Sequence, residues 1–176
     1  GIGMSTTTVY LAHKDHIEEI ASLRNAWGSG AMVWSALGEK YLGDAHIWSC
    51  NPVGAEKLWA LVRDPRLFTF ERIVLASTFD YAIIEAAKFY DAAEHWANFE
   101  GTHHKMNQVC HAGAISHLLL HHHREQTPCV GMCFQLTSVA EDQWQDWDDE
   151  KGEPIPFDID THKHFFVFEE FEQPPT

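Results

Sequence analysis

Apolar residues recur along much of this chain every three or four positions, which is the spacing of one face of a helix. The clearest example covers residues 79–99, where the apolar positions are Ala82, Ile83, Ala86, Phe89, Tyr90, Ala93 and Trp96. Start and stop signals frame other segments: Asn51-Pro52 is typical of a helix start, and Gly43 of a helix end. We therefore predict helices at residues 14–27, 31–41, 52–63, 79–99 and 106–123.

Shorter segments are rich in β-branched and aromatic residues, the composition of strands. These predict strands at residues 6–12, 72–78, 129–137 and 161–171. Helices dominate, and the strands fall early, in the middle and late, so the pattern favours a helix-rich α+β fold with a small sheet. Residues 4–176 are predicted to form one domain, with an acidic loop at residues 141–156 and a final strand after it. Residues 1–3, before Met4, are interpreted as a cloning remnant.

Composition limits the classes of function. Apolar residues make up 45% of the chain, enough for a packed core, and no apolar run reaches the ~18 residues that span a membrane. Twelve basic residues against 26 acids argue against a surface that binds nucleic acid directly. The four cysteines and the absence of a signal pattern predict reduced thiols and a cytoplasmic location.

The negative charge is concentrated near the C-terminus. Residues 141–176 hold twelve acids and two bases, a net charge of −10, whereas residues 1–140 hold fourteen acids and ten bases, a net of −4. Two tryptophans, Trp144 and Trp147, lie within the densest acidic run. A solvated loop has no need of them, so they either fold into the core or anchor a partner, because tryptophan is enriched at binding hot spots.

This segment is the first candidate site. We predict contact with a basic protein surface through Asp142, Trp144, Asp146, Trp147, Asp148, Asp149 and Glu150. An array of carboxylates can also imitate nucleic-acid phosphates, as in small inhibitors that mobile elements use in counter-defence; this is a functional analogy. The leading hypothesis is thus a non-enzymatic, acidic protein–protein interaction module, with nucleic-acid mimicry as one form of it and no cofactor.

The histidines supply the alternative hypothesis, a metal-dependent enzyme. His117 and His121 are four residues apart on a predicted helix, the spacing that presents two imidazoles to one metal. His162 and His164 share one face of the predicted last strand. These four histidines are candidate ligands of Zn²⁺. The structural alternative is that histidines at the end of a helix face its carbonyl pole without any metal.

Overall fold

The structure is a computed structural model that describes residues 5–25, 29–47, 52–103, 112–135 and 144–173. At its centre is a five-stranded mixed sheet with the order β2-β1-β4-β3-β7. Neighbouring strands are antiparallel except β3 and β7, which are parallel. The strands are β1 (Ser5–Ala12), β2 (Ile17–Asn25), β3 (Ala82–Glu85), β4 (Gly131–Gln135) and β7 (Phe165–Phe166).

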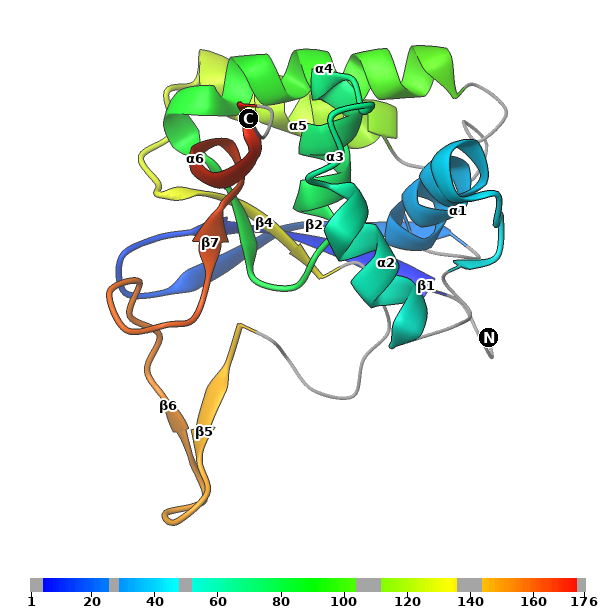
Figure 1. Cartoon of the computed structure of the whole chain (residues 1–176). Helices are drawn as coiled ribbons and strands as arrows, with labels where there is room; N and C mark the ends of the chain where they lie inside the picture. The colour runs from blue at the N-terminus through cyan, green and yellow to red at the C-terminus, as the bar shows by residue number, and fades with distance from the viewer. Residues whose placement is uncertain (1–4, 26–28, 48–51, 104–111, 136–143, 174–176) are drawn as a thin grey trace.

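Helices cover one face of this sheet (Figure 1), and α4 and α5 lie side by side above it. The helices are α1 (Ser29–Leu42), α2 (Val53–Leu61), α3 (Thr69–Ser77), α4 (Phe89–Thr102), α5 (Ala112–Arg124) and α6 (Val167–Phe171), with the 3₁₀ helix η2 (Ala86–Lys88) before α4. The predicted α+β class is confirmed. No helix in the described part of the chain is long and apolar enough to cross a membrane.

Alternate residues of the central strands enter two separate cores. Val9 and Leu11 of β1 pair with Phe134 and Met132 of β4, and these side chains pack under the helices. The residues between them point to the other face, where Ala12, Ile83, Cys133 and Trp144 form what we call the rear core. The sheet is therefore buried on both faces, and the rear core is built partly from the C-terminal third of the chain.

Helix α3 occupies the centre of the helical layer, and the prediction of a strand at residues 72–78 is wrong. Every residue from Glu71 to Ser77 is buried. A helix that is buried on all sides shows no amphipathic period, so a short apolar run of this kind cannot be told from a strand. The N-terminus of α3 is closed by Glu71, whose carboxylate accepts a hydrogen bond from the Phe68 N–H at 3.0 Å.

The prediction of a helix at residues 14–27 is also wrong, because β2 forms a hairpin with β1. A bulge shifts the register of the pair: Val9 lies opposite Ala21, whereas Tyr10 lies opposite Glu19, which leaves Ile20 as the extra residue. An extra residue breaks the alternation of a strand. The apolar positions of β2 consequently acquire a spacing of three and four that imitates a helix.

The helix predicted at residues 79–99 begins late. Tyr81 has a positive φ of 68°, which a helix does not accommodate, and β3 follows it. The helix proper, α4, starts at Phe89. Two predicted helices are confirmed in position, those at residues 31–41 and 52–63, and Gly43, with φ 67°, follows α1 as expected. The strand predicted at 129–137 corresponds to β4, although residues 136 and 137 lie outside the described part. Of the helix predicted at 106–123, residues 106–111 lie outside the described part.

The C-terminal third differs most from expectation. The predicted strand at residues 161–171 is only the two-residue β7, followed directly by α6. The carboxylate of Glu85, on β3, accepts hydrogen bonds from the N–H groups of Phe168 and Glu169 at 3.0 and 2.8 Å, and so caps α6 from a distant part of the sequence. The described part of the predicted acidic loop contains a second, two-stranded sheet of β5 (Asp146–Asp148) and β6 (Glu153–Ile155).

Candidate functional site

The two strands β5 and β6 form a hairpin that projects from the body of the domain (Figure 1). We call residues 146–155 the acidic hairpin. Trp147 lies opposite Pro154, Asp146 opposite Ile155, and Asp148 opposite Glu153. Because directly opposed residues share a face of an antiparallel pair, Trp147 is on one face and three carboxylates are on the other.

Asp148, at the end of β5, organises the turn of the acidic hairpin. Asp148 Oδ1 accepts hydrogen bonds from the N–H groups of Glu150 at 3.0 Å and Lys151 at 3.3 Å. The Asp148 carbonyl accepts a third bond from the N–H of Gly152 at 2.8 Å. Gly152 has φ 65°, a conformation that glycine adopts without the steric cost of a Cβ. The tip is thus a defined turn that presents its acids outward.

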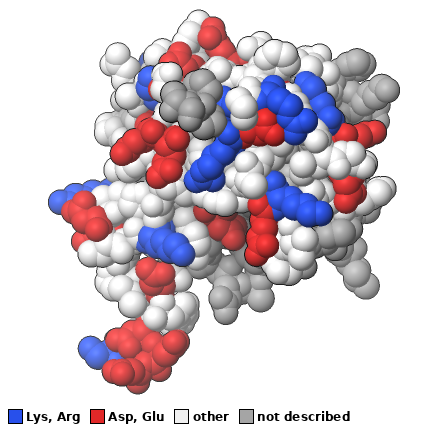
Figure 2. Space-filling view, viewed as in Figure 1, with Lys and Arg blue, Asp and Glu red and all other residues white. Residues whose placement is uncertain are grey.

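The charge of the acidic hairpin is strongly negative. Five acids stand against Lys151, a net charge of 1 − 5 = −4. Figure 2 shows acidic residues gathered at the end of the projecting segment. Within the described part of the chain, none of the five carboxylates takes part in an ion pair. The acids are Asp146, Asp148, Asp149, Glu150 and Glu153.

The two tryptophans of this segment have different roles. Trp147 is 59% exposed, whereas Trp144 is 3% exposed and belongs to the rear core. The Trp144 indole stacks on His162 with ring centroids 5.3 Å apart, and its Nε1 donates a hydrogen bond to the Phe134 carbonyl at 3.3 Å. Trp147 therefore fits the predicted role of an exposed anchor, while Trp144 is a packing residue that holds the hairpin to the domain.

The chain that follows β6 is also held at the rear core. Phe157 packs against the rear core and against the imidazole of His162, with ring centroids 5.0 Å apart, and His162 in turn stacks on Trp144. The Ile159 N–H donates a hydrogen bond to the carbonyl of Lys14 at 2.9 Å, between β1 and β2. The hairpin thus leaves and re-enters the domain at the rear core, which fixes its base and leaves its tip in solvent.

The structure places most of the residues that we predicted to contact a partner on the acidic hairpin. Asp146, Trp147, Asp148, Asp149 and Glu150 all lie on the acidic hairpin, whereas Asp142 lies outside the described residues. Glu153 and the 44% exposed Ile155 were missed. The signal that would have found them is the Asp148–Gly152 pair, because aspartate at the start and glycine near the end of a short polar segment are typical of a hairpin turn.

The four candidate metal ligands are not brought together. His117 and His121 are exposed on α5, whose buried residues face the helical side of the sheet. His162 lies in the rear core, on the opposite face, and its ring centroid is 6.2 Å from that of His164. Among the described residues, no group of three or more His, Cys, Asp or Glu side chains is placed to hold a metal ion. The sheet separates the two pairs of histidines.

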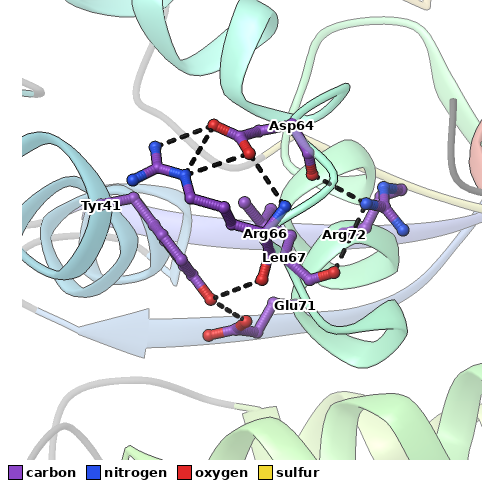
Figure 3. A network of polar contacts seen from close by, with 6 residues as sticks. All are labelled: Tyr41, Asp64, Arg66, Leu67, Glu71 and Arg72. Atoms are coloured by element: carbon purple, nitrogen blue, oxygen red, sulfur yellow. Dashed lines mark hydrogen bonds and ion pairs between the residues drawn. The ribbon is translucent and has the colours of Figure 1, made fainter.

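A buried polar network joins α1 and α3 (Figure 3), and it is a second concentration of ionisable groups. The fully buried Glu71 carboxylate accepts hydrogen bonds from Lys40 Nζ at 2.8 Å and from the Tyr41 hydroxyl at 2.5 Å. Next to it, the buried Arg72 guanidinium donates to the carbonyls of Asp64 at 2.8 Å and Val62 at 3.0 Å.

The electrostatics of Glu71 indicate a structural role. Burial alone raises the pKa of this carboxyl, but His103, Lys40, Tyr41 and the Phe68 N–H together outweigh burial and lower the pKa to about 2. A general base needs a pKa near the working pH and access to a substrate. Glu71 has neither, and its bonds to Lys40 and Tyr41 fix the packing of α1 against α3.

The acidic hairpin is therefore the candidate site that the described residues favour. It combines carboxylates that form no ion pair among the described residues with one exposed indole. Comparisons of the chain with protein family models, with curated proteins and with solved structures found no significant match in any of the three.

Proposed function

We propose that this protein is a protein–protein interaction module that binds a basic protein surface through the acidic hairpin. The observation that carries the proposal is the exposure of Trp147 at 59% on a projecting hairpin of net charge −4. Exposing an apolar indole ring to water is unfavourable in free energy. A two-stranded hairpin is, moreover, only marginally stable by itself in water. A partner that covers Trp147 and neutralises the acids would stabilise this arrangement.

The proposal includes proteins whose basic groove normally holds nucleic acid. Such a groove offers clustered Lys and Arg side chains, and the acidic hairpin is a narrow, negatively charged projection that enters a groove more readily than a flat surface does. Binding there would exclude nucleic acid and inhibit the partner. This form of the function predicts that an oligonucleotide and the protein compete for one site.

The test is affinity capture from a lysate of the source organism with three matched baits. They are the natural protein, a hairpin variant with Asp146, Asp149 and Glu150 changed to their amides, and a control with Glu169 and Glu170 of α6 changed to Gln. Both acids of α6 are exposed, and α6 retains its cap from Glu85. Asp148 is left intact because it organises the turn.

A partner of the proposed kind is captured by the natural protein and by the α6 control, and is lost with the hairpin variant. Its affinity, measured with the purified partner by titration calorimetry, falls steeply with salt, because the screening length shrinks from about 10 Å at 0.1 M to about 3 Å at 1 M. A set of captured proteins that is the same for all three baits contradicts the proposal. Displacement of the bound partner by a DNA or RNA oligonucleotide separates nucleic-acid mimicry from other basic partners.

A further inference from the structure

A groove outside the acidic hairpin lies where the C-terminal end of α5 meets the start of α4. Its volume is about 520 Å³, within the range of sites for small molecules. Both helices reach the same end of the domain in Figure 1. The groove is lined by Ala86, Ala87, Phe89, His122, His123, Arg124, Gln126 and Thr127.

The lining of the groove divides into two parts. The α5 side contributes the Arg124 guanidinium, two imidazoles and the Gln126 amide, all of which can donate hydrogen bonds. The η2 and α4 side contributes only apolar side chains, among them the buried Phe89. No carboxylate belongs to this lining, although the chain as a whole carries a net charge of −14. A guanidinium with further hydrogen-bond donors and no acids, beside an apolar wall, is the composition of a site for an organic anion.

The acids nearest to this groove have other partners or lie at its edge. Glu85, just before η2, is occupied by the N–H groups of α6. The Glu18 carboxylate lies within hydrogen-bonding distance of His13 Nε2, at 2.9 Å. Glu18 and Glu125 both act electrostatically on His122, and of these Glu125 follows the groove-lining Arg124 in the sequence. Arg124 therefore supplies the positive charge of the lining, with Glu125 next to it in the sequence.

The backbone at the end of α5 also favours an anion in this groove. The N–H of Gln126 donates to the His123 carbonyl and the N–H of Thr127 to the His122 carbonyl, both at 3.2 Å. This is the Schellman arrangement, which occupies carbonyls that would otherwise repel an anion. Its left-handed position is normally glycine, but here it is Gln126, with φ 50°. A strained residue on the lining of a groove points to a role for its side chain.

We propose that this groove binds a small organic anion, with its carboxylate or phosphate oxygens held by Arg124, His123 and Gln126 and its apolar body against Ala86 and Ala87 of η2. The arrangement of the donors favours this orientation. The guanidinium of Arg124 can offer two parallel N–H groups to such a headgroup. The ring of His123 packs against Tyr90 with centroids 5.4 Å apart, and His122 Nδ1 lies 2.9 Å from the Thr127 hydroxyl, so both imidazoles have fixed neighbours.

The proposal is tested by titrating the ¹⁵N-labelled full chain with four probes and following backbone amide shifts. Benzoate and phenyl phosphate carry both an anionic headgroup and an apolar body, inorganic phosphate lacks the body, and benzamide lacks the charge. We expect saturable shifts confined to residues 86–90 and 122–127 with benzoate or phenyl phosphate, and at least tenfold weaker effects with the other two. The stronger of the first two identifies the headgroup. Equal responses to benzoate and benzamide, or no saturable response to any probe, overturn the proposal.

Two variants and a control assign the residues. Arg124→Gln should weaken binding at least tenfold, whereas Arg63→Gln, on the α2 side of the domain, should leave it unchanged. Gln126→Gly should raise the melting temperature, because glycine relieves the positive φ, and should weaken binding because the amide is lost. Opposite effects on stability and affinity cannot come from misfolding. Unchanged binding by Arg124→Gln overturns the site, and unchanged binding by Gln126→Gly removes Gln126 from it.

Discussion

Asp148 lies directly opposite Glu153 in the acidic hairpin, so one cross-strand pair consists of two carboxylates. Like charges in such a pair destabilise a hairpin. Asp148 cannot be replaced without cost, because its side chain accepts two N–H groups of the turn. Glu153, in contrast, forms no ion pair within the described part of the chain. The free protein thus retains a repulsion that a cationic partner would relieve.

Replacing Glu153 with Gln should stabilise the acidic hairpin by about 0.2–1 kcal/mol, because one of the two opposed charges is removed. We expect slower hydrogen exchange at the Gly152 amide, which closes the turn, and weaker binding of a basic partner. Glu170→Gln, on α6, is the control and should change neither. Faster exchange at Gly152 in the Glu153 variant would contradict the assignment of repulsion to this pair.

The two tryptophans should respond differently to truncation. Trp144→Ala removes a buried side chain of the rear core and is expected to lower the free energy of unfolding by about 3–5 kcal/mol. Trp147→Ala removes an exposed side chain and should change stability by less than about 0.5 kcal/mol. Chemical denaturation of the two variants measures this difference. A large loss of stability in both would mean that Trp147 is a packing residue and would withdraw the main support for a binding hairpin.

The stability of the fold should depend on the charge of Glu71 in acid. Its folded-state pKa of about 2 lies below the ordinary value of 4.5, so its contribution is fully present above pH 4.5 and is lost as the pH falls toward 2. This difference corresponds to roughly 3 kcal/mol. Glu71→Gln should be less stable than the natural protein at pH 7, and the two should converge near pH 2. Denaturant unfolding at pH 7, 4.5 and 2.5 follows this, and a constant difference across the three would refute it.

Arg72 should not tolerate replacement by Lys although the charge is conserved. The guanidinium is 2% exposed and donates to the carbonyls of Val62, Asp64 and Leu67, which come before α3 in the chain. A lysine ammonium cannot reproduce this fork, and unpaired buried carbonyls cost about 1–3 kcal/mol each. We expect Arg72→Lys to lower the free energy of unfolding by about 2–4 kcal/mol. Arg66→Lys is the matched control, because the Arg66 side chain is exposed and pairs with the carboxylate of the same Asp64 at 2.8 Å.

The sequence supported the fold class because most helices keep one apolar face. Errors arose where tertiary contacts replace local signals. The bulge at Ile20 gave the strand β2 the apolar spacing of a helix, and full burial removed the amphipathic period of α3. The cap of α6 comes from Glu85, more than eighty residues away in the chain. None of these causes is visible in a window of neighbouring residues.

The candidate site was predictable to the extent that it is local. The charge run is contiguous in sequence, so most of its acids lie together with Trp147 on one projection. The different roles of Trp144 and Trp147 did not, because they depend on His162 and Phe134, which reach Trp144 from elsewhere in the chain. The groove beside Arg124 was not predicted either, since η2 and the end of α5 meet only through folding.

The attachment of the acidic hairpin separates two kinds of evolutionary constraint. Trp144 and Phe157 belong to the rear core, so substitutions there are limited by packing. In the hairpin between them, Asp148 and Gly152 are limited by the geometry of the turn, whereas the other residues contribute to neither core. Related chains are therefore expected to diverge fastest at these other positions of the projection, while Asp148, Gly152 and the domain beneath them change little.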